Sequence, residues 1–190
     1  MRDDFPVAAA YLWVALWIFW LASAVFVKRS IRKQSPGSQI VQSLPVIAGF
    51  YFLFGRGIWP HWLRLRFVPV SPVWTRTGLV ITAMGIALAV WARLWIGRNW
   101  SGTVTIKERH ELIQNGPYGL VRHPIYSGFL LAFLGTAIIV GELHGLMGFL
   151  MVVLGWGLKA RLEESFMTQQ FGAAYLDYKR RVKALVPFVV

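Results

Sequence analysis

The sequence predicts an all-α integral membrane protein with about five transmembrane helices, and three observations support this fold class. Apolar residues make up 56% of the chain, and the mean hydropathy is positive, at +0.53. The first long apolar stretch, residues 7–27, contains no charged residue and is long enough, at about 1.5 Å per helical residue, to cross a roughly 30 Å hydrocarbon core. Basic residues gather at the ends of such stretches. We therefore expect residues 1–190 to form a single membrane domain.

Composition also excludes several classes of function. The absence of cysteine excludes disulfides, thiolate catalysis and cysteine-based metal sites, and we expect no metal. The net charge of +12 could indicate nucleic acid binding, but the basic residues lie at the ends of apolar runs, where they contact lipid headgroups. We therefore expect membrane lipids as partners and no nucleic acid.

The first half of the chain predicts three spans. The stretch 7–27 is the first, and because it lacks the cleavage pattern of a secretory signal we interpret it as a retained span. A polar turn with Pro36 and Gly37 follows, then a second span at about 40–59, which Pro45 is expected to kink. The segment 61–70 alternates apolar and basic residues and is expected to lie along the interface.

The third span is predicted at about 77–96 and carries Arg93 near its end. This arginine either reaches to the headgroups or faces a polar cavity, and we favour the headgroups. Residues 98–123 lack a spanning signal and form the longest connection in the chain. Apolar residues within it predict an ordered loop with a short strand-like piece near residues 103–106.

The second half predicts a helical hairpin. A fourth span, 124–141, is separated by a very short break from a fifth at about 145–158, whose helix is expected to continue until Gly172. An amphipathic helix should follow over residues 173–183. With the N-terminus outside, fourteen lysines and arginines lie in the cytoplasm against five outside, so the positive-inside rule selects this orientation.

Residues 116–128 concentrate polar chemistry directly before the fourth span. Pro117 and Pro124 disfavour helix in the residues before them, so Arg122 and His123 should lie on irregular backbone at the mouth of a helix. A helix N-terminus binds anions, and an arginine beside it adds a bidentate fork. Unpaired surface charges are the alternative, but the neighbouring tyrosines and prolines favour a functional site.

Antiparallel packing of the last two spans should bring this segment to a pair of carboxylates. Arg122, His123 and Tyr126 begin the fourth span, and Glu163 and Glu164 follow the fifth. Cations and carboxylates that converge in this way suit a zwitterionic ligand. The alternative is an interfacial cluster of salt bridges.

Two groups of residues carry a resemblance to a known family. They are Gly116-Pro117-Tyr118-x-x-Val121-Arg122-His123-Pro124-x-Tyr126-x-Gly128, and Glu163-Glu164 followed by Phe171-Gly172-x-x-Tyr175-x-x-Tyr178. Over residues 94–188 the chain resembles the isoprenylcysteine carboxyl methyltransferases and, more distantly, the membrane phospholipid N-methyltransferases.

The resemblance implies S-adenosylmethionine as cofactor, bound within a core of residues 98–190 that the first three spans and the interfacial segment, 1–97, support. It implies that the pocket lies between the last two spans, the long loop and the C-terminal helix. Cofactor-binding residues are then Gly116, Tyr118, Leu120, Val121, Arg122, His123, Tyr126, Glu163 and Glu164.

The resemblance leaves the methyl acceptor open. A prenylated cysteine carboxylate would be oriented by Lys159 or Arg161, whereas a phospholipid amine would need a base, for which Glu163 or Glu164 is nearest. We place Lys159, Arg161 and Glu164 in the catalytic set and favour the carboxylate. A nicotinamide-dependent membrane reductase and a non-enzymatic membrane protein are the alternatives. We expect a multi-pass protein of the inner (plasma) membrane of a prokaryote.

Overall fold

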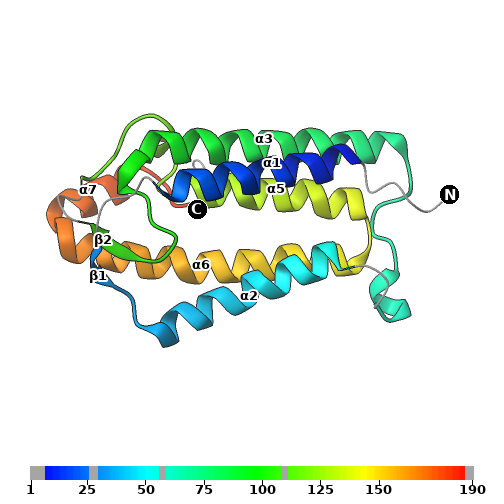
Figure 1. Cartoon of the computed structure of the whole chain (residues 1–190), viewed down its shortest axis with the longest axis horizontal. Helices are drawn as coiled ribbons and strands as arrows, with labels where there is room; N and C mark the ends of the chain where they lie inside the picture. Colours follow the sequence, from blue (N-terminus) through cyan, green and yellow to red (C-terminus); the bar gives the residue numbers. More distant parts are fainter. Residues whose placement is uncertain (1–6, 26–29, 56–58, 108–110, 187–190) are drawn as a thin grey trace.

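The computed structural model describes residues 7–25, 30–55, 59–107 and 111–186. Within them the chain is almost entirely helical (Figure 1). The long helices are α1 (Val7–Ala24), α2 (Pro36–Phe54), α3 (Pro72–Ile96), α5 (Pro124–Val140) and α6 (Leu143–Phe171). Shorter elements are η1 (His61–Arg64), η2 (Gly97–Asn99), α4 (Pro117–Leu120), α7 (Ala173–Arg181) and the strands β1 (Ser30–Lys33) and β2 (Thr105–Lys107).

Each long helix overlaps one of the five predicted spans, but the second differs in its bounds: α2 begins at Pro36, where a polar turn was expected, because Ser35 caps it, and it ends at Phe54 rather than near residue 59. Four of them, α1, α2, α3 and α6, are long and apolar enough to cross a membrane, while α5 is apolar but has only 17 residues. The third helix begins at Pro72 rather than near residue 77, because Ser71 caps it by accepting a hydrogen bond from the N–H of Val73. As predicted, the helix of the fifth span, α6, continues well beyond residue 158. It ends at Phe171 and is followed by Gly172, which has a φ of 53°.

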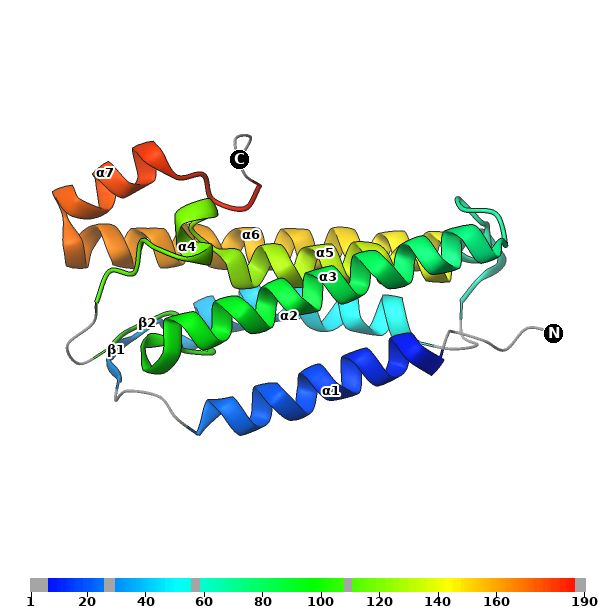
Figure 2. The same ribbon diagram turned by 90° about the horizontal axis from the view of Figure 1, so that it is seen from above.

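Two antiparallel helix pairs form the bundle, α3 with α5 and α2 with α6 (Figures 1 and 2). Glycines allow each pair to approach closely. A Cβ on Gly85 would lie 2.5 Å from the carbonyl oxygen of Gly128, and one on Gly148 would lie 2.7 Å from that of Gly49. Small residues favour close helix packing in membranes, where lipid supplies no hydrophobic drive to associate.

Aromatic side chains fill the space between the two pairs. Trp13 of α1 packs edge-on against Phe50, Phe54 and Phe133, with ring centroids between 5.1 and 6.0 Å apart. Its indole N–H donates to Thr136 Oγ1 of α5 at 3.0 Å. Trp13 therefore ties α1 to both helix pairs, and edge-to-face packing of this kind adds to the stabilisation from buried area.

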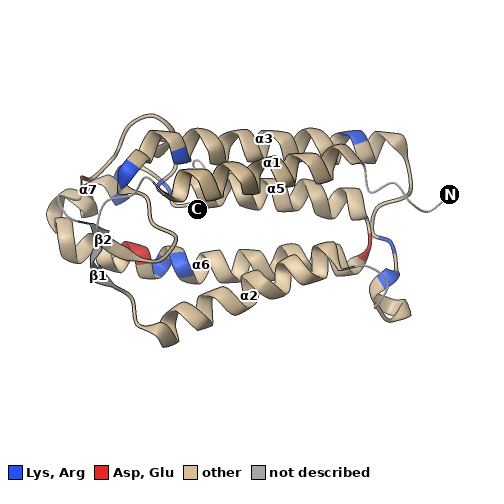
Figure 3. Cartoon of the chain, viewed as in Figure 1, with Lys and Arg blue, Asp and Glu red and all other residues tan. Residues whose placement is uncertain are grey.

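Polar elements lie at the two ends of the bundle. Charged residues are sparse along the middle of the helices and more frequent toward the two ends of the bundle (Figure 3). Segment 61–70 does not cross the bundle, in agreement with the interfacial prediction, and contributes only the short η1. Lys28, Arg29 and Arg109 of the predicted cytoplasmic set, and Arg2 and Arg56 of the outer set, lie outside the described residues.

The end of the bundle away from segment 61–70 holds a small antiparallel sheet of β1 and β2 (Figure 1). The strand β2 falls where the loop was expected to have a strand-like piece, whereas its pairing with Ser30–Lys33 was not predicted. Together with the ends of α3 and α6, the start of α5, α4 and α7, this sheet surrounds the candidate site (Figures 1 and 2).

The expectation that Arg93 reaches to the headgroups was wrong. The residue is 3% exposed, and its guanidinium lies 4.5 Å from the ring centroid of Trp100. It donates to the carbonyl of Ser23 at 2.5 Å and to that of Gly97 at 2.9 Å. Arg93 therefore joins the carboxyl ends of α1 and α3, where unpaired carbonyls attract a cation.

Candidate active site

The connection between α3 and α5 carries the central polar residues on short turns. Gly116, with a φ of 58°, precedes α4, and the indole of Trp95 occupies the space that a side chain there would take. Pro117 opens α4 and Pro124 opens α5, at positions where a helix needs no backbone N–H. Arg122 and His123 consequently lie on non-helical backbone between the two helices, as predicted.

Glu164 of α6 is bound by three basic side chains from other elements. Its Oε1 accepts hydrogen bonds from Arg122 Nε at 2.9 Å and Nη2 at 2.5 Å, and lies 3.3 Å from His123 Nε2. Its Oε2 lies 2.7 Å from Lys179 Nζ of α7. Glu164 is only 9% exposed. This carboxylate therefore holds together the start of α5, the end of α6 and α7.

The preceding residue, Glu163, has different partners because neighbours on a helix do not face each other. Its Oε2 accepts a hydrogen bond from Tyr126 Oη at 2.7 Å and lies 3.6 Å from His123 Nδ1. The His123 ring stacks on Tyr126, and Tyr126 lies parallel to Trp156 at a centroid distance of 6.2 Å. His123 thus lies between the two glutamates with its ring held by aromatic packing.

Hydrogen bonds attach the segment after α7 to Arg122 and His123. The backbone N–H groups of Arg122 and His123 donate to two carbonyl oxygens of segment 182–185, at 2.8 and 3.0 Å, and Arg122 Nη1 donates to a third. The phenol of Tyr178 donates to the Tyr118 carbonyl at 2.5 Å. Most N–H groups of Arg122 therefore donate hydrogen bonds to Glu164 or to backbone carbonyls. Arg122 thus holds the surrounding segments in position and also places a positive charge at the site.

A cavity opens beside the cluster, and five of the predicted residues line it: Tyr118, Arg122, His123, Tyr126 and Glu163. Within the described residues its wall does not include the other predicted ones, namely Gly116, Leu120, Val121, Lys159, Arg161 and Glu164. Leu120 is 56% exposed, and Val121 is buried where it pairs with Lys183. Sequence reasoning assigned no role to Asn99, Thr105, Glu111 or Met167, which also line the cavity.

The two candidate cations for the acceptor have different surroundings. Lys159 Nζ lies 5.6 Å from the ring centroid of Tyr126 and donates to the Gly102 carbonyl at 2.6 Å. Arg161, two residues further along α6, is exposed. The structure therefore brings Lys159, and not Arg161, against a residue of the cavity wall.

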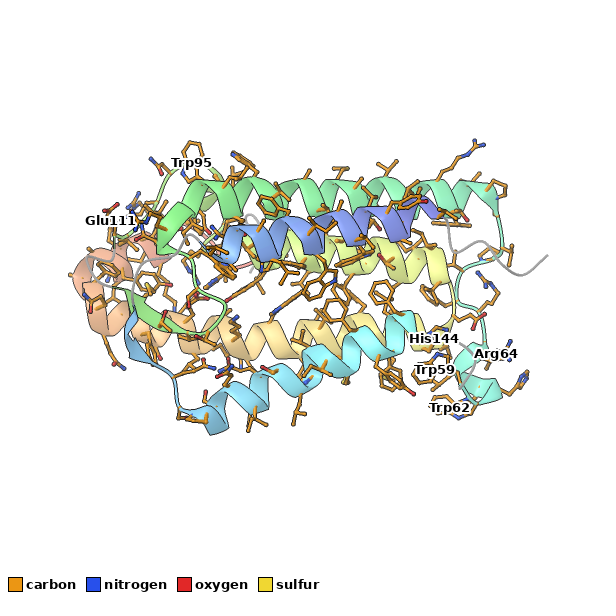
Figure 4. All side chains as sticks on the ribbon, viewed as in Figure 1. Trp59, Trp62, Arg64, Trp95, Glu111 and His144 are labelled. Atoms are coloured by element: carbon orange, nitrogen blue, oxygen red, sulfur yellow. The ribbon has the colours of Figure 1, made fainter. Side chains whose placement is uncertain are left out.

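Electrostatics favour a charged imidazole among neutral phenols. Burial by itself lowers the pKa of His123, but hydrogen bonds to Glu163 and Glu164 and their negative charges outweigh it, so the pKa is raised above its usual range. Burial also raises the pKa of the Tyr118 phenol, and that of Tyr178 to about 12, so both stay neutral near pH 7. Figure 4 shows Trp95 and Glu111 at this end of the bundle, with His144 at the other.

Comparisons with known proteins point to one family. Residues 74–174 match the family model described as phospholipid methyltransferase. The chain is 31% identical over 164 residues to protein-S-isoprenylcysteine O-methyltransferase B of Arabidopsis thaliana, covering 84% of this chain and 76% of that protein. It is 28% identical over 134 residues to the Mus musculus protein-S-isoprenylcysteine O-methyltransferase, covering 69% of this chain and 45% of the mouse protein.

A solved structure is similar over most of the fold. It is that of a eukaryotic intramembrane Ras methyltransferase, an isoprenylcysteine carboxyl methyltransferase, which matches with a TM-score of 0.52 and 25% identity. The match covers 84% of this chain and 55% of that one. The chain therefore spans about half the length of some relatives and about three quarters of others.

Proposed function

This chain is an integral membrane methyltransferase of the isoprenylcysteine carboxyl methyltransferase family, and from that premise we propose that it transfers a methyl group from S-adenosylmethionine to a membrane-borne hydrophobic acceptor. The observation that carries the proposal is the meeting of Arg122, His123 and Tyr126 with Glu163 at one cavity. That cavity lies at the end of a bundle of apolar helices, and we propose that a lipid-anchored substrate reaches it from the surrounding lipid.

The groups around the cavity fit the chemistry of such a methyl donor. The donor combines an ammonium, a carboxylate and a nucleoside, and it supplies a methyl group already activated by a sulfonium. Glu163 offers an anionic partner for the ammonium, and Arg122 and His123 supply positive charge for the carboxylate. Tyr118 and Ile113 give the cavity apolar surface that suits a purine ring.

Three other predicted cofactor-binding residues do not line the cavity but hold the residues that do. Glu164 fixes Arg122 and His123, and Gly116 admits Trp95 beneath the turn that carries Tyr118. Val121 anchors the turn to the C-terminal segment. The protein contributes alignment and exclusion of water rather than a covalent step, which is where displacement reactions gain most of their rate.

We propose the carboxylate of a prenylated cysteine as the acceptor, because cationic side chains contact residues of the cavity wall. Lys159 lies against Tyr126, and the exposed Arg161 lies two residues away on the same helix. Arg93 is a further candidate: it is buried against Trp100, which lines the cavity, and its Nε has no hydrogen-bond partner in the described part of the chain. An anionic acceptor is attracted by these groups, whereas an ammonium is repelled.

The phospholipid amine is the second candidate, since the matching family model carries the name phospholipid methyltransferase. An amine must lose a proton, and Glu163, one of the two glutamates in the cavity wall with Glu111, is our candidate to receive it. We also propose that the site faces the cytoplasm, because the excess of basic residues lies on the same side as this end of the bundle.

Incubation of the detergent-solubilised protein with radiolabelled S-adenosylmethionine tests the proposal. The acceptors are a farnesylated cysteine analogue with a free carboxylate, its methyl ester and phosphatidylethanolamine. We expect label in the free acid and none in the ester. Label in phosphatidylethanolamine alone contradicts the carboxylate assignment, and the absence of label from every hydrophobic acceptor contradicts the function.

A further inference from the structure

Two buried side chains in the cavity wall carry oxygen atoms that bond to nothing in the protein. Asn99, at the end of η2, is 8% exposed, and Thr105, at the start of β2, is 5% exposed. Neither Asn99 Oδ1 nor Thr105 Oγ1 has a hydrogen-bond partner within the described residues, although both residues line the cavity. Buried polar atoms without partners are uncommon in folded proteins, because each costs folding free energy.

The segment between these two residues is held firmly, so a loosely packed loop does not explain the unpaired atoms. The carbonyl of Gly102 accepts a hydrogen bond from Lys159 Nζ at 2.6 Å, and that of Val104 accepts one from the backbone N–H of Gln34 at 3.0 Å. The Val104 side chain is fully buried and packs with Phe166 of α6. The backbone between Asn99 and Thr105 is therefore anchored to α6 and to Gln34 by contacts within the protein.

The chemistry of the unpaired atoms selects their partner. Asn99 Oδ1 only accepts hydrogen bonds, and the Thr105 hydroxyl can donate one and accept up to two. Neither carries a charge, so neither competes with Glu163 for an ammonium or with Arg122 and His123 for a carboxylate. Of the chemical parts of the proposed methyl donor, the nucleoside is the one that presents neutral hydroxyl and amine groups.

Resting on the proposed function, we propose that Asn99 and Thr105 form a hydrogen-bonding subsite for the neutral O–H and N–H groups of the donor's nucleoside. Glu163, Arg122 and His123 then serve the amino-acid part of the same molecule. This division assigns the wall formed by η2 and β2 to nucleoside recognition, and the wall formed by the turn before α5 and by α6 to charge recognition.

Calorimetric titration in detergent with two probes tests this division. One probe is S-adenosylhomocysteine, and the other is methylthioadenosine, which keeps the nucleoside and lacks the amino-acid part. Asn99→Leu and Thr105→Val remove the unpaired oxygens while keeping the number and branching of the side-chain heavy atoms, and should each weaken both probes roughly tenfold. Thr105→Ser keeps the hydroxyl and should restore the affinity. Glu163→Gln should weaken S-adenosylhomocysteine much more than methylthioadenosine.

The unfolding temperature of the protein without probe distinguishes binding from a structural role. Because the two oxygens have no partners inside the described protein, Asn99→Leu and Thr105→Val should leave that temperature unchanged or raise it. Gln42→Leu is the matched control: Gln42 is 6% exposed with an unpaired Oε1, but it lies on α2 and is not among the residues lining the cavity. Its probe affinities should equal those of the wild type.

Each result bears on a distinct claim. If the wild type binds S-adenosylhomocysteine and both variants bind it equally well, the subsite is wrong and the proposed function stands. If the variants change only the KM for the hydrophobic acceptor, the two residues bind the acceptor and the subsite is again wrong. If the wild type binds neither probe, the proposed function and the subsite fall together.

Discussion

Arg122 and Glu164 form a buried ion pair in which both Nε and Nη2 of the guanidinium donate to the same carboxylate oxygen, at 2.9 and 2.5 Å. Their side chains are 7% and 11% exposed. The pair joins the turn before α5 to α6, and the remaining contacts of Arg122 hold the end of α7 and the segment that follows it. The two groups of residues that carry the family resemblance therefore meet in this ion pair, as they do in the hydrogen bonds of Tyr126 with Glu163 and of Tyr178 with the Tyr118 carbonyl.

Breaking this pair should destabilise the protein strongly. Arg122→Ala leaves a buried carboxylate with fewer partners, and Glu164→Ala leaves a buried guanidinium, so each should cost about 3 kcal/mol or more of unfolding free energy. The double variant should lose less than the sum of the two. Thermal unfolding in detergent measures both effects.

Asp177 provides the control for that comparison. Its ion pair with Arg181 on α7 joins residues four apart, with side chains 63% and 59% exposed. Asp177→Ala should change the stability by less than about 0.5 kcal/mol, because exposed pairs of this kind contribute little. If Glu164→Ala and Asp177→Ala lost equal amounts of unfolding free energy, the buried ion pair would contribute no more to stability than the exposed one.

His123 should make the stability depend on pH. Its pKa is raised in the folded protein, so it binds a proton more tightly there than in the unfolded chain. The resulting stabilisation is fully present below the unfolded pKa, about 6.5, and is lost as the pH rises through the raised folded value. Unfolding temperatures measured from pH 5.5 to 9 should therefore fall over this window in the wild type.

The variant His123→Gln should lack that fall, because glutamine does not titrate. His61→Gln, which changes a histidine on the distant η1, should retain it. A pH profile that is the same in all three proteins would mean that His123 does not carry the proton assigned to it.

Local patterns were sufficient to predict the helices and the polar cluster. Pro124 marked the start of α5, and the absence of a helix breaker before Gly172 correctly predicted that α6 continues through Glu163 and Glu164. Given those boundaries, antiparallel packing places Glu164 at Arg122 and Glu163 at Tyr126. Each of these inferences depends on residues close in sequence or on one hairpin.

Long-range contacts account for the features that were missed. The sheet pairs strands more than 70 residues apart, and the sequence of Ser30–Lys33 carries no signal that identifies β2 as its pairing partner. Arg93 was expected at the headgroups because its sequence position lies near a helix end, but the carbonyl of Ser23 and the ring of Trp100 surround it in the fold. Asn99 and Thr105 reach the cavity for the same reason, since the loop folds back onto α6.

Close packing of α3 on α5 should make Gly85 intolerant of any side chain. A Cβ there would lie 2.5 Å from the Gly128 carbonyl oxygen and 2.9 Å from Ala132 Cα, both backbone atoms that cannot rotate away. Gly85→Ala should therefore cost roughly 1–3 kcal/mol. Gly157→Ala on α6 is the control, because a Cβ there meets nothing within 4 Å and alanine favours helix. Loss of stability in Gly157→Ala but not in Gly85→Ala would refute the packing described for this helix pair.

Lys159 should matter more than Arg161 for an anionic acceptor. Lys159 Nζ lies 5.6 Å from the Tyr126 ring at the cavity wall, and Arg161 is exposed on the same helix. Lys159→Ala removes one positive charge beside the cavity and also the hydrogen bond to the Gly102 carbonyl, whereas Arg161→Ala removes the same charge further from it. The KM for the farnesylated cysteine analogue should therefore rise more in Lys159→Ala, by roughly tenfold for the loss of one close charge interaction.

The affinity for S-adenosylhomocysteine separates this effect from damage to the donor site. It should change little in Arg161→Ala, and less than the acceptor KM in Lys159→Ala, because the charged groups assigned to the donor are Glu163, Arg122 and His123. Lys159→Arg keeps the positive charge and should recover most of the lost acceptor binding, which a purely structural role for the Gly102 contact does not require. A larger rise in KM for Arg161→Ala than for Lys159→Ala would instead place the acceptor's carboxylate on the outer face of α6, away from Tyr126, and would contradict the proposed approach of the substrate.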